Sequence, residues 1–138
     1  MNYKLNASRQ LNELASKAPS NVPQVTKNTR FNNEENKLYY AYPRFLLRLL
    51  NDQLRQQLFF PWETPGELEP LHLHLAITHH WKLEEAREAG EDDLLNLLRP
   101  ELMAVRIARA DVQAILESLG DIPAEAIRND LLARSLAE

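Results

Sequence analysis

Residues 43–60 read PRFLLRLLNDQLRQQLFF, and this stretch decides the fold. Its apolar residues recur at spacings of one, three and four, which aligns them along one face of an α-helix. Pro43 suits the first turn of a helix, and Pro61 ends the run. The stretch therefore predicts a helix whose inner face is formed by Leu46, Leu47, Leu50, Leu54 and Leu58.

Further helices are predicted on the C-terminal side of this stretch. Proline favours the first turn of a helix and glycine the position after its last turn, so we expect one helix from Pro70 towards Gly90. Within it, residues 71–77 read LHLHLAI, an alternation that is also typical of a half-buried strand, and both interpretations stay open there. The preceding loop, residues 61–69, is rich in proline and carries Trp62, which we expect to pack on a helix.

The last third of the chain predicts more helices. Acidic residues 91–93 favour a helix start ahead of LLNLL, and Pro100 either kinks this helix or begins another. An apolar seam then continues to Gly120, with Arg109 lying on it. A final helix opens at Pro123, and its expected inner face is formed by Ile127, Leu131, Leu132 and Leu136.

The N-terminal residues differ in character from the rest of the chain. They hold eight asparagines up to residue 37 and only scattered apolar residues, too few to offset the entropy cost of ordering this segment alone. We therefore expect a basic, asparagine-rich arm over residues 1–37 and a helical domain over residues 38–138. One short helix is expected within the arm before Pro19. A separate turn of helix is expected over residues 34–42, because a proline disfavours helical geometry in the residue before it.

Length and composition indicate the class of protein. The chain has 138 residues, the size of one domain, and no stretch approaches the ~20 apolar residues that span a bilayer. We predict an all-α fold, a small bundle of four or five helices with an N-terminal arm that is extended or becomes ordered on a partner. The chain has no cysteine, and its first residues lack the apolar core that a signal peptide needs, so we expect a cytoplasmic location.

Charge is divided unevenly along the chain. Residues 1–62 carry nine Lys and Arg against four Asp and Glu, whereas residues 63–138 carry seven against sixteen. Because opposite fields attract opposite partners, the two parts are expected to offer unequal binding surfaces. These features predict a non-enzymatic protein–protein interaction module, an adaptor or small subunit of a larger assembly, which uses a basic arm and an acidic helical body.

Four groups of residues are the candidates for contacting a partner. Apolar side chains in the arm are expected anchors, and the tyrosine cluster after it suits an interface, where tyrosine is enriched. Three arginines at spacings of four and seven form a basic stripe on one helix face, and acidic residues after the histidines are expected to receive a basic surface. In chain order the candidates are Val22, Val25, Phe31, Tyr39, Tyr40, Tyr42, Arg44, Arg48, Arg55, Glu84, Glu85, Glu88 and Asp92.

The partner is expected to be another protein or a second copy of the chain, without contact to a membrane. The alternative function is a nucleic-acid-associated regulator, in which the arm and the arginine stripe contact phosphates and tyrosines stack on bases. The net charge of −4 and the lack of a zinc-finger or RNA-binding signature make this the second choice.

Catalytic and metal sites are not predicted. The three glycines form no phosphate-binding loop, serine has no elbow-like setting, and without cysteine there is no thiolate. All four histidines lie within nine residues, yet no pair has the three- or four-residue spacing with which one helix chelates a metal. Only His80 and Glu84 have that spacing, so we expect polar, interfacial histidines, no cofactor and no enzyme activity. The histidines are His72, His74, His79 and His80.

Overall fold

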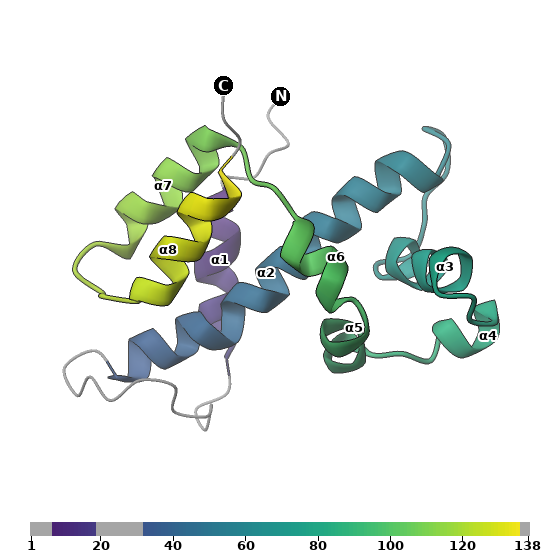
Figure 1. The fold of residues 1–138 in the computed structure, drawn as a ribbon, viewed down its shortest axis with the longest axis horizontal. Coiled ribbons are helices and arrows are strands. Elements are labelled where there is room, and N and C mark those ends of the chain that lie inside the picture. The colour runs from purple at the N-terminus through teal and green to yellow at the C-terminus, as the bar shows by residue number, and fades with distance from the viewer. Residues whose placement is uncertain (1–6, 19–31, 136–138) are drawn as a thin grey trace. The chain divides into compact units, whose positions relative to one another are not determined.

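The computed structural model describes residues 7–18 and 32–135 of the chain (Figure 1). These residues form eight helices and no strand, apart from an isolated bridge between Ile107 and Ser135, so the predicted all-α class is confirmed. Among the described residues, no helix combines the length and the apolar character needed to cross a bilayer. The helices are α1 (Ala7–Ser16), α2 (Asn32–Leu58), α3 (Glu69–Thr78), α4 (Leu83–Ala86), α5 (Glu91–Leu97), α6 (Arg99–Ala104), α7 (Arg109–Leu119) and α8 (Glu125–Arg134).

The chain divides into two compact units. The terminal unit holds Met1–Phe45 and Arg106–Glu138, and the central unit holds Leu46–Val105. Among the described elements, α1, α7 and α8 belong to the terminal unit and α3 to α6 belong to the central unit. Helix α2 contributes its first half to the terminal unit and its second half to the central unit. Each unit buries leucines of its own.

Helix α2 runs through Pro43 without a break, so the expected separate turn over residues 34–42 is wrong. A proline inside a helix costs ~3 kcal/mol, because one hydrogen bond is lost and the ring meets the preceding turn. Before and after Pro43, Leu38 and Phe45 are 4% and 0% exposed. Burying each such side chain contributes about 1.5–3 kcal/mol, which together outweighs the cost of the proline.

Helix α1 is the short helix expected in the arm, and it docks on α7 within the terminal unit. Its Leu11 and Leu14 are almost completely buried. The helix is therefore held by the same chain. Residues 19–31, which connect it to α2, lie outside the described residues, and α2 begins at Asn32, before the expected start of the helical domain.

The segment LHLHLAI is helical, because it lies within α3, where Leu71 and Leu75 are both fully buried one turn apart. The expectation of one helix from Pro70 towards Gly90 is wrong. Helix α3 ends at Thr78, and His80 has a φ of +60°, a left-handed conformation that no helix continues through. The Trp81 amide then donates back to the Leu75 carbonyl, 3.4 Å away, and α4 begins at Leu83.

Gly90 precedes a helix instead of following one. It is the N-cap of α5, with a φ of −85°, and its amide donates to Oδ2 of Asp93 at 3.3 Å. The acidic first turn of α5, Glu91 to Asp93, agrees with the predicted helix start. Pro100 lies in the first turn of the next helix, α6, so of the two expectations for this proline the second is confirmed.

The apolar seam expected between Pro100 and Gly120 is interrupted, because α6 ends at Ala104 and α7 begins at Arg109. Between them the buried Ile107 donates its amide to the Arg134 carbonyl at 3.0 Å, which takes this residue out of helical geometry. Arg109 is exposed at the start of α7, three residues before the buried Val112. In α8, Leu132 is 56% exposed and not part of the inner face.

Candidate functional site

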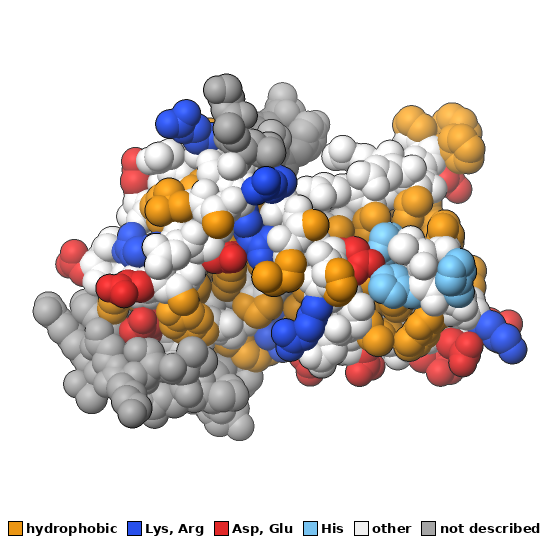
Figure 2. Space-filling view, viewed as in Figure 1, with side chains coloured by type: hydrophobic (Ala, Val, Ile, Leu, Met, Phe, Trp, Pro, Cys, Tyr) orange, Lys and Arg blue, Asp and Glu red, His pale blue; other side chains and the backbone are white. Residues whose placement is uncertain are grey.

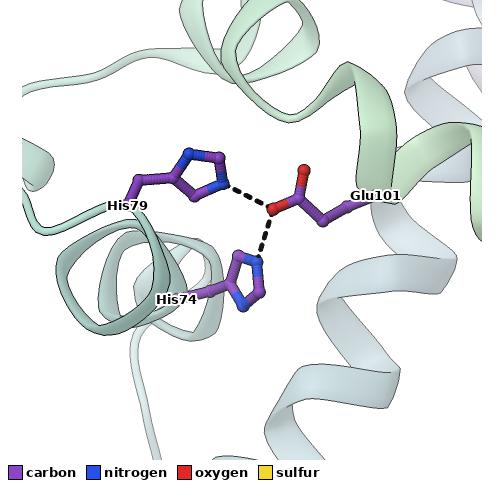
Figure 3. Close-up of side chains that lie close together, drawn as sticks. All are labelled: His74, His79 and Glu101. Carbon is purple, nitrogen blue, oxygen red and sulfur yellow. Dashed lines mark hydrogen bonds and ion pairs between the residues drawn. The ribbon is translucent and has the colours of Figure 1, made fainter.

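Three side chains with metal-ligand chemistry converge in the central unit, from α3, from its C-terminal end and from α6 (Figure 3). Nε2 of His74 lies 2.7 Å from Oε2 of Glu101, and Nε2 of His79 lies 2.6 Å from the same oxygen. The ligand atoms of the three residues all lie within 4.8 Å of one another. Because an ionised carboxylate only accepts hydrogen bonds, each ring donates from Nε2. We call this arrangement the His–His–Glu cluster.

The end of α3 brings the two histidines together. On a continuous helix, side chains five residues apart point about 140° away from each other. His79 lies just past the last residue of α3, and the left-handed residue His80 follows it, so the chain leaves the helical path at this point. His79 therefore reaches the carboxylate that His74 also contacts. No local pattern indicates this convergence, since Glu101 lies 27 residues from His74 on another helix.

The cluster is partly buried, with side-chain exposures of 15% for His74, 18% for Glu101 and 31% for His79. Burial raises the pKa of Glu101, whereas the hydrogen bonds from His79 and then His74 lower it. Together with smaller effects the lowering outweighs burial, so this pKa lies below its ordinary value. Its second oxygen, Oε1, is buried and accepts no hydrogen bond from the described residues. The carboxylate therefore keeps lone pairs for another ligand.

The other two histidines are not part of the cluster. His72 Nε2 lies 2.9 Å from the Ala89 carbonyl, so this contact joins α3 to the segment between α4 and α5. His80 is exposed, and within the described part of the chain no hydrogen bond or ion pair joins it to Glu84. His80 and Glu84, the pair with chelating spacing in the sequence, therefore form no such contact in the described part of the chain.

Tyr42 is the most buried of the tyrosines predicted to contact a partner. It is 7% exposed, and its hydroxyl donates to Oδ2 of Asp130 at 2.5 Å, within the terminal unit. Nε of Arg134 donates to the same oxygen at 2.6 Å. Burial, followed by the bond to Asp130, raises the pKa of Tyr42 well above its ordinary value. Tyr39 and Tyr40 are half-buried.

The predicted arginine stripe consists of side chains with different surroundings. Arg44 is half-buried, donates to the Tyr40 carbonyl at 2.9 Å, and lies over the Tyr40 ring with Cζ 3.8 Å from its centroid. Arg48 and Arg55 are exposed, and Nη2 of Arg55 lies 4.0 Å from Oδ1 of Asp52. Burial raises the pKa of Asp52, although Arg55 and Arg48 act in the opposite direction.

The acidic candidates are all exposed, on α4, just after it and in the first turn of α5. They are Glu84, Glu85, Glu88 and Asp92. The three apolar anchors predicted in the arm, Val22, Val25 and Phe31, lie outside the described residues.

The expectation that Trp62 packs on a helix is wrong, because its side chain is 77% exposed. It stacks instead on Phe60, itself 62% exposed, with ring centroids 5.0 Å apart and ring planes 7° apart. Figure 2 shows apolar side chains gathered where α2 ends. We call Phe60 and Trp62 the aromatic pair. The sequence does not indicate this exposure, because the apolar character of Trp62 alone favours packing on a helix.

Comparisons of the chain with protein-family profiles, with curated proteins and with solved structures find no match. The aromatic pair, the acidic residues and the His–His–Glu cluster are therefore interpreted from their own chemistry.

Proposed function

We propose that the chain is a non-enzymatic interaction module, an adaptor or small subunit, whose central unit binds a basic protein partner. The aromatic pair is the anchor of this contact. The observation that carries the proposal is that Phe60 and Trp62 stack on each other while both remain more than half exposed. Large aromatic side chains of this kind are enriched at the energetic centres of protein interfaces.

The energy available from the aromatic pair is large but not sufficient alone. Covering the exposed parts of the two rings removes on the order of 200–300 Å² from water, worth ~5–7 kcal/mol at about 25 cal/mol per Å². Association itself costs roughly 4–15 kcal/mol in lost translational and rotational freedom. The surrounding surface must therefore contribute to binding as well.

The turn that carries the aromatic pair supports this role because it is held in place in the free chain. The Glu63 amide donates to the Phe60 carbonyl at 2.9 Å, and the Phe60 amide donates to Oε1 of Glu63 at 2.7 Å. Pro61 and Pro65 stiffen the backbone on either side of Trp62. An anchor ordered before binding loses less entropy on association, which favours affinity.

The charge of the central unit supports a basic partner. Leu46–Val105 carries five Lys and Arg against eleven Asp and Glu, a net charge of −6. Acidic side chains that stay in solvent steer a positively charged surface towards the unit and accelerate association. A symmetric contact between two copies would bring two such units together, and nucleic acid would meet the same negative field. We therefore propose that the partner is a different, basic protein and neither a second copy of the chain nor nucleic acid.

Other parts of the proposal rest on the sequence. The cysteine-free composition favours a cytoplasmic location. Val22, Val25 and Phe31 remain predicted anchors of the arm, and the arginine stripe remains the basis of the alternative, a nucleic-acid-associated regulator.

Affinity capture from an extract of the source cells, followed by titration of the captured protein, tests this function. We expect wild type to enrich a basic protein that Trp62→Ala does not enrich. Truncating a central aromatic anchor costs about 2 kcal/mol or more, which is roughly 30-fold in affinity. Met103→Ala shortens another apolar side chain, 73% exposed, and is the matched control that should keep the interaction.

Binding of the purified partner to each variant is then measured by calorimetry for the affinity and by stopped-flow mixing at several salt concentrations for the association rate. Changing Glu84, Glu85 and Glu88 together to lysine should slow association and weaken its dependence on salt. Equal affinity of wild type and Trp62→Ala would refute the aromatic pair as the anchor. Recovery of nucleic acid, or of a second copy of the chain, in place of a basic protein would contradict the choice of partner.

A further inference from the structure

The His–His–Glu cluster has the donor set of a zinc site. Zn²⁺ is bound in proteins by imidazole nitrogen and carboxylate oxygen, and sets of two histidines and one glutamate leave a fourth position for water or another ligand. Imidazole also suits Cu²⁺, Ni²⁺ and Co²⁺, whereas Mg²⁺ and Ca²⁺ prefer oxygen ligands alone. The chemistry of His74, His79 and Glu101 therefore selects a transition metal.

The distances in the cluster fit such an ion after small movements. Around a tetrahedral zinc with bonds of about 2.0–2.2 Å, neighbouring ligand atoms are about 3.3 Å apart. The two Nε2 atoms now lie 2.7 Å and 2.6 Å from Oε2 of Glu101, and all three ligand atoms lie within 4.8 Å. Shifts of about 1 Å, within the reach of side-chain rotation, convert the hydrogen-bonded arrangement into a coordinating one.

The ion pairs and hydrogen bonds around the cluster are also compatible with a bound metal. Among the described residues, only His74 and His79 form ion pairs with the Glu101 carboxylate, and its buried Oε1 has no hydrogen-bond partner. A divalent cation would compensate the charge of this partly buried group. On metal binding each neutral ring carries its proton on Nδ1, and Oγ1 of Thr78 lies 3.4 Å from Nδ1 of His74, where an outer partner of a metal-bound histidine is expected.

An ion has access to the cluster from solvent. His79 is 31% exposed, and Figure 2 shows histidine side chains at the visible surface over α3. Water would fill the fourth coordination position of such an ion. An ion bound by these three residues would link the end of α3 to α6 within the central unit.

We infer that His74, His79 and Glu101 bind one divalent transition-metal ion, Zn²⁺ in the first instance, through the two Nε2 atoms and the Glu101 carboxylate. This site is separate from the aromatic pair, and its occupation does not depend on the proposed partner.

The test is zinc binding by the full chain, without a histidine tag and freed of metal with a chelator. Titration with ZnCl₂ at neutral pH, followed by calorimetry and by metal analysis after dialysis, is expected to give one ion per chain. Zinc should also raise the melting temperature. Co²⁺ is expected to give a visible absorption spectrum typical of a four- or five-coordinate site with nitrogen and oxygen ligands.

Glutamine variants separate coordination from hydrogen bonding. In His74→Gln and His79→Gln the amide still offers an N–H donor near the position of Nε2, so the bond to Glu101 is kept while the metal ligand is lost. We expect either change to weaken zinc binding by more than about 100-fold, beyond the 10- to 100-fold typical of outer partners. His72→Gln is the matched control on the same helix, and its affinity should be unchanged.

His80→Asn is the second control, because asparagine tolerates the left-handed conformation that this residue adopts. Three outcomes would overturn the inference. They are a wild type that binds no zinc, a His79→Gln variant that binds zinc as wild type does, and controls that lose as much affinity as the cluster variants. If His74→Gln fails to fold, as seen by circular dichroism, the more exposed His79 still provides the test.

Discussion

At the scale of single residues, helix α2 carries two buried polar groups that join it to α8 in the terminal unit. Oε2 of Glu35 accepts the amide of Ala124, the N-cap residue of α8, at 3.0 Å, and the Tyr42 hydroxyl donates to Asp130 further along α8. A carboxylate at a helix N-terminus is favoured by the helix dipole. A hydrogen bond to a charged group contributes about 1.5–3 kcal/mol to stability. Each of these contacts therefore stabilises the fold about as much as the burial of one leucine side chain.

Tyr42→Phe tests this contact through pH. The folded state raises the pKa of Tyr42, so its stabilising effect is complete below the ordinary tyrosine value of about 10 and is lost as pH rises above that value. We expect the free energy of unfolding of wild type to fall above about pH 10, by at most about 1.4 kcal/mol per pH unit from this group. The variant should lose about 1.5–3 kcal/mol at neutral pH and show a shallower fall in alkali.

Urea unfolding followed by circular dichroism between about pH 7 and about pH 11 measures both effects. Tyr40→Phe keeps the ring under Arg44 and is the matched control, expected to follow wild type. An equally steep alkaline fall in Tyr42→Phe would mean that the phenol does not couple to stability.

At the scale of elements, the apolar patterns predict that helices exist but not where several of them end. The period of leucines reveals α2, because burial of one face dominates it, whereas the alternating residues of α3 leave helix and strand equally compatible with the pattern. The breaks at His80 and at Ile107 depend on a left-handed backbone and on a hydrogen bond to Arg134, 27 residues away. Contacts this distant in sequence leave no local pattern.

Contacts between residues distant in sequence also explain why the His–His–Glu cluster is not predicted from the sequence. His79 meets His74 only because α3 ends before it, and Glu101 joins them only because α6 lies beside α3. The exposure of the acidic residues could be anticipated from their charge, whereas that of Trp62 could not.

Pro43→Ala tests the cost of the proline inside α2. Alanine restores the missing amide and removes the clash with the preceding turn, which stabilises the folded chain by up to ~3 kcal/mol. About 1 kcal/mol of this is lost, because the unfolded chain without proline has more conformational freedom. We expect the free energy of unfolding to rise by about 1–2 kcal/mol and the melting temperature to rise with it. A lower stability would show that the ring packs in a way that alanine cannot replace.

At the scale of the whole molecule, the two units differ in charge. The terminal unit carries eleven Lys and Arg against nine Asp and Glu, a net charge of +2, whereas the central unit has −6. The unit with the aromatic pair is thus also the one with the strong field. This combination is the reason to expect a basic partner with an apolar pocket.

The most direct test of whether this surface binds a different protein is the solution mass of the purified chain. Absorbance at 260 and 280 nm is recorded across the same peak. We predict a monomer of 16.0 kDa without excess absorbance at 260 nm, at low and at moderate salt. A dimer that Trp62→Ala converts to monomer would place a second copy on the aromatic pair and contradict the account. Co-purified nucleic acid that salt removes would contradict it as well, and would favour the regulator instead.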